Sequence, residues 1–468
     1  MFKIQVNNFE KKDLLKELID EFLPKSAYEV RDSFSEDSVS EDSINGDVLI
    51  SVNRDGNSDV NQVKRELYEA LSKYIIDPPD WGILTGVRPV KLAGELREKL
   101  GRKEADEKLK RDYLISDEKT NLILDIYDYQ IESCGRPEEN SFSLYIGIPF
   151  CPTRCSYCAF ASNQEDYSEI KKYLEALNRE IDFVAEEVSK IGLYPESIYF
   201  GGGTPTILSS SDLEELMRRV GKTFDLSKLR EYTVEAGRPD TIDKEKLSVI
   251  KEGGAIRISI NPQSMKERTM ELIGRLHKPS DIERAYLEAR EIGFDSINMD
   301  LIAGLPEETP EDFIESLNII SDMDPENITV HSLSVKRASR LIEENPELYR
   351  SQSDGVRKMV SYALSDLRSK DYRPYYLYRQ KHMAGACENI GYSKPGKEGL
   401  YNIRIMDEHQ SNIALGAGGI SKVYHPKENR LERVANVTNY REYINRIEEM
   451  LDRKKEGVFN AYNSTKGN

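Results

Sequence analysis

Three of the five cysteines in this 468-residue chain lie in one short segment. Cys151, Cys155 and Cys158 form a Cys-x3-Cys-x2-Cys loop directly after an apolar stretch, residues 143–150, that predicts a strand. A structural zinc ion takes four protein ligands, and the other two cysteines, Cys134 and Cys387, are distant in sequence. Three thiolates from one loop can instead hold three irons of a [4Fe-4S] cube and leave the fourth iron open to a substrate. The spacing therefore favours an iron–sulfur site, with a zinc site as the alternative.

Polar side chains and glycines follow the strand-like stretches that come after the cysteine loop. Each of them alone is an ordinary residue at a strand end or a tight turn. Together they would bring carboxylate, amide and guanidinium groups to one rim, where such groups suit ribose hydroxyls, an adenine and a ligand carboxylate. They are, in chain order, Gly202, Gly203, Thr204, Glu235, Gln263, Arg275 and Asp300.

These residues must be positioned by a repeating arrangement of strands and helices. From residue 143, apolar strand-like runs alternate with amphipathic helical stretches in six β/α steps. The segment Thr309-Pro310-Glu311-Asp312 has the capping hydroxyl, proline and acidic groups that favour a helix start. The alternation predicts an α/β fold with a parallel sheet, either doubly wound or curved into a partial barrel. In both cases the active groups lie at the carboxyl ends of the strands.

The segments on either side of this core have a different pattern. We predict an N-terminal α+β domain with a helical linker over residues 1–134, a core over 135–336 and a mixed C-terminal domain over 337–468. An acidic, serine-rich stretch at residues 32–47 is typical of a loop. Trp81, the single tryptophan, is interpreted as a packing anchor.

Composition excludes several classes of function. Acidic residues outnumber basic ones by 83 to 66, for a formal charge of −17, which argues against a broad surface for nucleic acid. No apolar run approaches the length of a membrane span, and residues 1–15 lack the apolar stretch of a signal peptide. We therefore expect a cytoplasmic protein that binds neither nucleic acid nor membrane, and whose thiols stay reduced.

Residues 143–335 resemble the radical S-adenosylmethionine (SAM) superfamily, whose signature is Cys-x3-Cys-x2-Cys at the end of the first strand of a β/α domain. Within it, the chain is similar to the oxygen-independent coproporphyrinogen III oxidase group through the segments IPFCPTRCSYCAF, GGGTPT, VEAGRPDT, RISINPQS and NMDLIAGLPEET. The flanking segments WGILTGVRPVKL and YLYRQKHMAGACENIGYS resemble the HemZ-type branch, the coproporphyrinogen dehydrogenases. The resemblance implies a partial (β/α)6 barrel with a small N-terminal α+β domain and a mixed C-terminal extension.

The resemblance also implies the cofactors and their residues. Cys151, Cys155 and Cys158 would hold a [4Fe-4S] cluster, with Tyr157 against it, and the open iron would bind SAM. The residues implied in binding SAM are Tyr145, Gly202, Gly203, Thr204, Glu235, Gln263, Arg275 and Asp300.

The implied reaction is the oxidative decarboxylation of two propionates of coproporphyrinogen III to vinyl groups. It needs a low-potential electron donor, a flavodoxin or a ferredoxin, and a final electron acceptor. Cationic anchors for the substrate carboxylates would come from Lys336, Arg337, Arg340, Arg373 and Arg379, with a solvated charged face as the alternative.

A haem-binding chaperone that keeps the fold and the cluster is the alternative function. Such chaperones carry a His-Asn-x-x-Tyr-Trp stretch, and here the corresponding run is Glu388-Asn389-Ile390-Gly391-Tyr392-Ser393. Phe160 stands where the well-studied oxidase has a further cysteine. His331, near the end of the sixth strand, is interpreted as a core histidine, with a pocket-facing position as the alternative.

Overall fold

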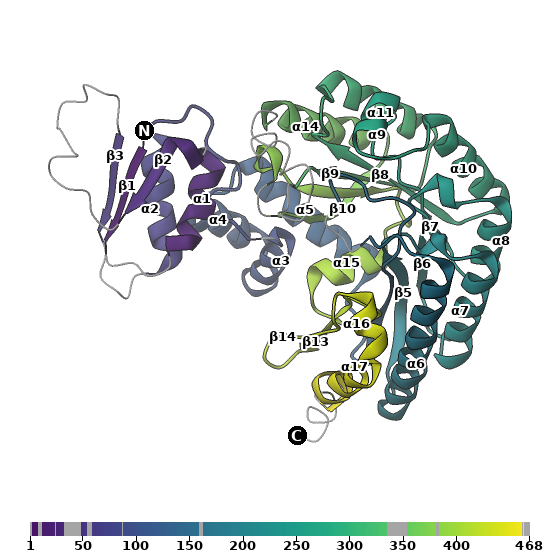
Figure 1. The fold of residues 1–468 in the computed structure, drawn as a ribbon. Coiled ribbons are helices and arrows are strands. Elements are labelled where there is room, and N and C mark those ends of the chain that lie inside the picture. The colour runs from purple at the N-terminus through teal and green to yellow at the C-terminus, as the bar shows by residue number, and fades with distance from the viewer. Residues whose placement is uncertain are drawn as a thin grey trace.

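The computed structural model describes residues 2–7, 12–23, 25–31, 48–53, 59–86, 88–158, 162–334, 353–380, 383–460 and 462. Within these ranges the strands form a three-stranded and an eleven-stranded sheet. Figure 1 shows the small sheet in a unit of its own, joined by helices to the large sheet. The acidic stretch 32–47 and Phe160 lie outside the described residues.

The N-terminal unit is a parallel sheet in the order β2-β1-β3 with two helices. Its core is separate from the main one and includes Ile4, Leu18 and Leu67, all completely buried. Neither β1 nor β2 was predicted from the sequence, although the alternation in FKIQVN, which forms β1, is a strand signal. The elements are β1 (Phe2–Asn7), α1 (Lys12–Phe22), β2 (Tyr28–Arg31), β3 (Val48–Asn53) and α2 (Val60–Ser72).

The connection to the main sheet contains Trp81, which is 2 % exposed. Its indole Nε1 donates to Glu388 at 3.0 Å, and the Arg379 guanidinium lies 5.0 Å from the ring centroid. The predicted packing role is thus confirmed. Three helices follow where the sequence indicates one long helical region, namely α3 (Pro89–Leu100), α4 (Arg102–Tyr113) and α5 (Asp117–Cys134).

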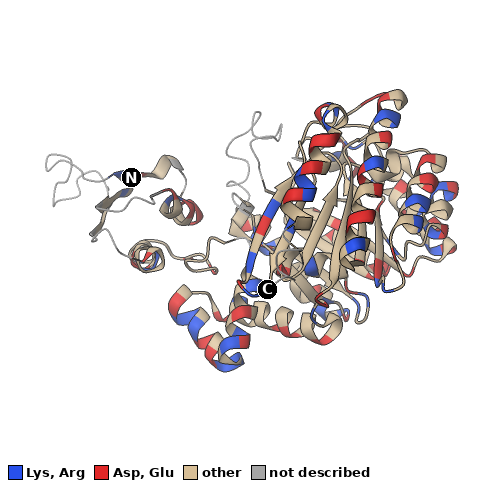
Figure 2. Ribbon diagram, turned by 90° about the horizontal axis from the view of Figure 1, so that it is seen from below, with Lys and Arg blue, Asp and Glu red and all other residues tan. Residues whose placement is uncertain are grey.

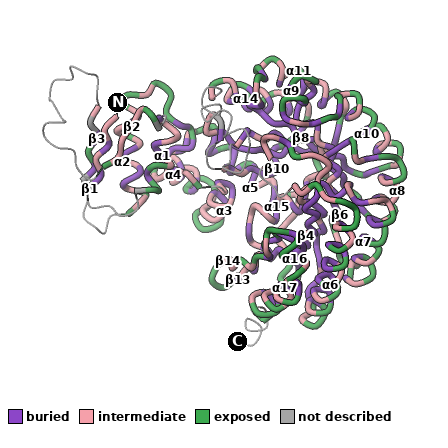
Figure 3. Tube along the Cα trace, viewed as in Figure 1, coloured by how far each residue is buried: buried purple, intermediate pink, exposed green. Residues whose placement is uncertain are grey.

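Six parallel strands, each the neighbour of the next in the chain, form the centre of the large sheet. They are β4 (Ser141–Ile148), β5 (Tyr194–Gly202), β6 (Glu231–Glu235), β7 (Arg257–Ser259), β8 (Ser296–Ala303) and β9 (Asn327–Ser332). The helices between them cover the outer side of the curved sheet in Figure 1 and bury their inner faces against it in Figure 3. They are α6 (Tyr167–Ile191), α7 (Ser210–Thr223), α8 (Lys244–Glu252), α10 (Pro279–Ile292) and α11 (Pro310–Asp322). The short helix α9 (Glu267–Leu272) precedes α10 and packs in a separate cluster that includes Tyr157 of the cysteine loop. The predicted α/β fold is confirmed, and α11 begins with the predicted cap, because Thr309 Oγ1 accepts from Asp312 N.

The C-terminal strands extend the same sheet at both edges. β10 and β11 follow β9, and β12 pairs in parallel with β4 and leads to the β13–β14 hairpin. The elements are α14 (Ser353–Ser369), β10 (Arg373–Tyr378), β11 (Asn389–Ser393), α15 (Leu400–Asp407), β12 (Ser411–Leu415), β13 (Ile420–His425), β14 (Arg430–Ala435), α16 (Tyr440–Asn445) and α17 (Ile447–Lys454). The predicted domain boundaries stay predictions.

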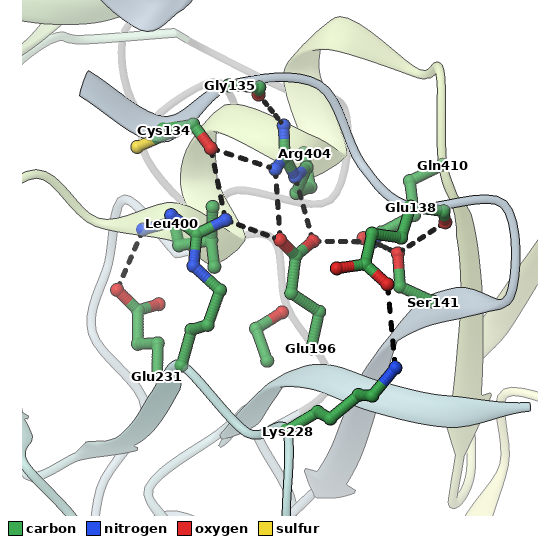
Figure 4. Close-up of polar contacts among 12 residues, drawn as sticks. Cys134, Gly135, Glu138, Ser141, Glu196, Lys228, Glu231, Leu400, Arg404 and Gln410 are labelled. Carbon is green, nitrogen blue, oxygen red and sulfur yellow. Dashed lines mark hydrogen bonds and ion pairs between the residues drawn. The ribbon is translucent and has the colours of Figure 1, made fainter. Parts of the chain in front are cut away.

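The segment containing α15 closes the end of the sheet at which the six strands begin. Glu196, near the start of β5, accepts from Arg404 Nε and Nη2 at 3.0 Å each and from Gln410 at 2.7 Å, as Figure 4 shows. Glu231, at the start of β6, accepts from the backbone N–H groups that open α15. Arg257 donates to the carbonyls of residues 397 and 398. These buried, paired charges hold α15 across the amino ends of the strands.

Figure 2 shows basic and acidic residues mixed over the outward faces of the helices. Among the described residues, no helix combines the length and the apolar character needed to cross a bilayer.

Candidate active site at the carboxyl ends of the strands

The cysteine loop starts where β4 ends and is closed at its base by Asn163. The Cys151 N–H donates to the Asn163 carbonyl at 3.0 Å. Asn163 in turn donates to the Pro149 carbonyl through its backbone N–H at 3.0 Å and its Nδ2 at 2.8 Å. The first cysteine is therefore fixed directly above the end of the strand.

The tri-glycine segment at the end of β5 packs against the strand end that leads into the cysteine loop. Gly202 has a φ of +115°, which favours glycine, and the Gly203 N–H donates to the Ile148 carbonyl at 2.8 Å. A Cβ at Gly203 would lie 2.5 Å from the Phe150 carbonyl oxygen and 2.9 Å from Cys151 Sγ. Thr204 Oγ1 lies 3.4 Å from the same sulfur. These glycines therefore let the cysteine segment approach closely, a role that the sequence does not reveal.

Arg275 connects the cysteine loop to the ends of two strands. This buried guanidinium donates through Nη1 to the Gly237 carbonyl at 3.0 Å and to the Asn261 carbonyl at 2.5 Å. Its Nη2 donates to Tyr157 Oη at 3.1 Å, so Tyr157 is anchored from outside its own loop. The Nε atom is buried and has no hydrogen-bond partner among the described residues.

Two carboxylates face the inside of the sheet. Glu235 ends β6 and accepts from Tyr199 Oη at 2.5 Å; burial raises its pKa to about 7, and that hydrogen bond only partly opposes the rise. Burial alone would also raise the pKa of Asp300, but interactions with His331 and Asn298 outweigh it and hold the pKa below its usual value. Asn298 Nδ2 donates to Asp300 at 2.7 Å, and His331 Nε2 lies 3.6 Å from its other oxygen. Opposite shifts in neighbouring carboxyls are typical of functional sites.

His331 is not a core histidine. Its side chain is 27 % exposed and stands between Asp300 and Tyr378, whose Oη is 3.4 Å from Nδ1. The exposure of this side chain beside Asp300 fits the alternative that the sequence left open, a pocket-facing position.

Gln263 is held in a strained backbone conformation, with a φ of +67°. Its N–H donates to the Asp300 carbonyl at 2.8 Å, and its own carbonyl accepts from Ile302 N at 3.0 Å. The side-chain Oε1 is buried and has no hydrogen-bond partner among the described residues. An unpaired buried oxygen is costly, so this atom is suited to accept a hydrogen bond from a ligand.

Tyr145 is part of a stack that sequence reasoning missed. Its ring lies 6.2 Å from that of Tyr199 on β5, and Tyr199 lies 4.4 Å from Tyr401 on α15. Tyr145 and Tyr199 are register partners in adjacent strands, and the alternation of each strand could have placed both inside. No local signal points to Tyr401, which comes from the segment that closes the opposite end.

A few side chains near the carboxyl ends of the strands are partly exposed to solvent. Along β4, β5, β6, β8 and β9 most residues are buried, and the partly exposed ones include Tyr145, Tyr199, Glu235, Asp300 and His331. The functional groups at the carboxyl ends are therefore accessible to a ligand.

Comparisons with known proteins give the family of the chain. A profile described as "Radical SAM superfamily" matches residues 145–320. The Bacillus subtilis "Oxygen-independent coproporphyrinogen-III oxidase-like protein HemZ" is 40% identical over 382 residues, which are 80% of this chain and 76% of that protein. The chain belongs to the HemN/HemZ-like family of radical SAM proteins.

Two other matches show the range of this family. The "Heme chaperone HemW" of Bacillus subtilis is 31% identical over 66% of this chain and 76% of that protein. The solved coproporphyrinogen III oxidase (HemN) of Escherichia coli has the same fold, with a TM-score of 0.52 and 21% sequence identity over 69% of this chain and 72% of that one. The predicted family is thereby confirmed.

Membership in the radical SAM family implies a [4Fe-4S] cluster and SAM as cofactors, as predicted. Among the described residues, no group of three or more His, Cys, Asp or Glu side chains is placed to hold a single metal ion. A zinc ion requires four donors at about 2.0–2.3 Å from one centre, whereas a cube spreads its thiolates over different irons. The loop with three thiols and the glycine-lined approach to Cys151 fit the cluster. The unpaired atoms of Gln263 and Arg275 fit a polar ligand beside it.

The two expected substrate anchors in the tyrosine-rich segment, Arg373 and Arg379, make contacts within the protein. Arg379 is 4 % exposed and is bound to Glu21 at 2.9 Å and to the Ala386 carbonyl at 3.1 Å. Arg373 lies at the other end of β10, with its guanidinium 5.3 Å from the Tyr129 ring centroid. Lys336, Arg337 and Arg340 fall outside the described residues.

Proposed function

We propose that this protein catalyses the oxygen-independent oxidative decarboxylation of coproporphyrinogen III to protoporphyrinogen IX, a step of haem biosynthesis. The observation that carries the proposal is 40% identity over 80% of the chain to a protein named for its likeness to that oxidase. The accessible carboxylates and the cysteine loop at one end of the sheet support it. The proposal places the protein in the cytoplasm.

The proposal gives each group at the rim a role. Cys151, Cys155 and Cys158 hold three irons, and Tyr157 packs beside them. Glu235 and Asp300 accept hydrogen bonds from SAM hydroxyl or amino groups, and Gln263 offers its unpaired Oε1. The other SAM-binding residues are Tyr145, Gly202, Gly203, Thr204 and Arg275.

The cofactors held by these residues would supply, on reduction by a flavodoxin or a ferredoxin, a carbon radical able to remove a hydrogen atom from the propionate carbon next to the ring. Each propionate side chain then loses one hydrogen atom, one CO2 and one electron and becomes a vinyl group. The electron passes to a separate acceptor. The residues of this chain bind and orient the reactants. They also restrict the entry of water, because α15 covers the amino ends of the strands.

A haem chaperone is the second candidate, favoured by the 31% identity to HemW. The residue that corresponds to the chaperones' histidine is Glu388, which is 1 % exposed. Its carboxylate accepts from Trp81 at 3.0 Å and from Lys119 at 2.6 Å. This position therefore serves the internal packing of the protein, and the enzymatic proposal leads.

The deciding experiment uses the full chain, reconstituted with iron and sulfide without oxygen. Reduced protein is incubated with SAM and coproporphyrinogen III, and 5′-deoxyadenosine, CO2 and protoporphyrinogen IX are measured. About four irons per chain and all three products are expected. Haem binding with four irons but without decarboxylated product would favour the chaperone, and a colourless protein with one zinc would refute both candidates.

A further inference from the structure

Arg238, in the turn after β6, points into the cysteine loop from a distant part of the chain. The side chain is 4 % exposed. Its Nη1 lies 3.6 Å from Cys155 Sγ, and its Nη2 donates to Thr153 Oγ1 at 2.9 Å. One guanidinium thus contacts both a cysteine and the residue between two cysteines.

Asp240 fixes the orientation of this guanidinium. Its carboxylate accepts from Arg238 Nε at 3.1 Å and from Nη2 at 3.0 Å, which is a two-point contact. Nη1 is then the nitrogen directed at the sulfur. Because Asp240 is 29 % exposed at its side chain and Arg238 is nearly enclosed, water screens the carboxylate more than the guanidinium.

Cys155 and Cys151 differ in their hydrogen-bond donors. Cys155 receives a hydrogen bond from the cationic Arg238 and also lies near the Arg275 guanidinium, whereas Cys151 is approached by the neutral hydroxyl of Thr204 at 3.4 Å. Charged donors form hydrogen bonds roughly twice as strong as neutral ones. Hydrogen bonds to the sulfurs and nearby charge are among the factors that set the reduction potential of an iron–sulfur cluster.

We infer that Arg238 is a positioning residue that tunes the cluster, by donating a charge-assisted hydrogen bond to the Cys155 thiolate. A cation at this sulfur stabilises the reduced cluster, which carries one more negative charge than the oxidised one. It therefore raises the reduction potential and makes the cluster easier to reduce. Asp240 limits this effect by partly compensating the charge. The inference rests on the proposed cluster site but not on the identity of the substrate.

The test measures the midpoint potential of the reconstituted full chain by redox titration followed by electron paramagnetic resonance. Arg238→Gln should keep four irons and shift the one-electron equilibrium about tenfold toward the oxidised form, which corresponds to about 59 mV. Arg238→Lys, which keeps the charge without the planar fork, should shift it less in the same direction. Asp240→Asn should shift it the opposite way, because the guanidinium charge is then uncompensated.

The matched control is Arg284→Gln. Arg284 donates to the Pro239 carbonyl in the same turn at 3.4 Å and pairs with Glu288 on its own helix. Removing it disturbs the turn but not the cysteine loop, so the midpoint should stay at the wild-type value.

The possible outcomes separate this inference from the proposed function. Wild-type midpoints in Arg238→Lys and Asp240→Asn would overturn the inference, even if Arg238→Gln failed to fold. A purely structural role would lower the thermal stability of the variants without moving the midpoint in opposite directions. If the midpoint potentials shift as expected but the wild type decarboxylates no coproporphyrinogen III, the role of Arg238 is supported and the proposed substrate is refuted. A wild-type protein that binds no four-iron cluster would overturn both the role of Arg238 and the proposed function.

Discussion

Replacing Gly203 with alanine tests whether the tri-glycine segment supports the cysteine loop. The new Cβ would lie 2.5 Å from the Phe150 carbonyl oxygen, and Cβ atoms essentially never approach within 3.0 Å of a neighbouring atom. One of the two segments must therefore move by about 0.5 Å or more, which is the tolerance within which a functional site has to be held. Overpacking of this kind costs about 1–3 kcal/mol. Cys151 is displaced with Phe150, because its Sγ would lie 2.9 Å from the same Cβ.

The assay has two parts. Urea unfolding of the metal-free chain should show the loss of stability, and iron content with visible absorbance after anaerobic reconstitution should fall below the wild-type level. Gly221→Ala is the matched control, because a Cβ at this helical glycine of α7 meets nothing within 4 Å. That variant should bind iron normally and gain up to about 1 kcal/mol in stability. Unchanged stability together with a full complement of iron in Gly203→Ala would refute the reasoning.

Three further changes are predicted from the structure. The pKa of the Glu235 carboxyl is about 7 in the folded chain and 4.5 ordinarily. As pH rises, this carboxyl therefore loses its proton at a lower pH in the unfolded chain than in the folded chain. The free energy of unfolding of the metal-free wild type should therefore fall between pH 4.5 and 7, relative to Glu235→Gln, by roughly 3 kcal/mol; parallel pH profiles would contradict this. Trp81→Phe removes the indole N–H that donates to the buried Glu388 carboxylate, so the free energy of unfolding should fall by about 1–3 kcal/mol. An unchanged midpoint of chemical unfolding would argue against this hydrogen bond. Cys155→Ala should lose the four-iron cluster and all SAM cleavage, while Cys387→Ala, a buried thiol outside the loop, should keep both; a variant at position 155 that still cleaves SAM would rule out its role as a ligand.

The sequence predicts the chemistry that depends on local spacing. The Cys-x3-Cys-x2-Cys loop, the glycines after the second strand and the capped start of α11 are short segments whose function depends on neighbours a few residues away. The six β/α steps follow from hydrophobic periodicity, and right-handed crossovers leave few ways to assemble them. The order of the parallel strands and the rim that carries Glu235 and Asp300 could therefore be expected from the sequence.

Contacts between distant segments could not be expected in this way. Arg379 is a cation in a tyrosine-rich strand and was expected to bind substrate, but it pairs with Glu21 of the N-terminal unit. Periodicity shows that a strand exists and which face is apolar, but it does not show which buried charge meets which partner.

The sequence by itself therefore determined the family, the fold class and the cofactors, because all of these depend on spacing and order along the chain. Only the tertiary structure decided that Arg238 reaches Cys155, that Tyr401 stacks on Tyr199 and that α15 closes the amino ends of the strands. Those contacts join residues that are tens to hundreds of positions apart. Their geometry is set by the packing of the whole sheet and its helices, and no local preference of the chain encodes it.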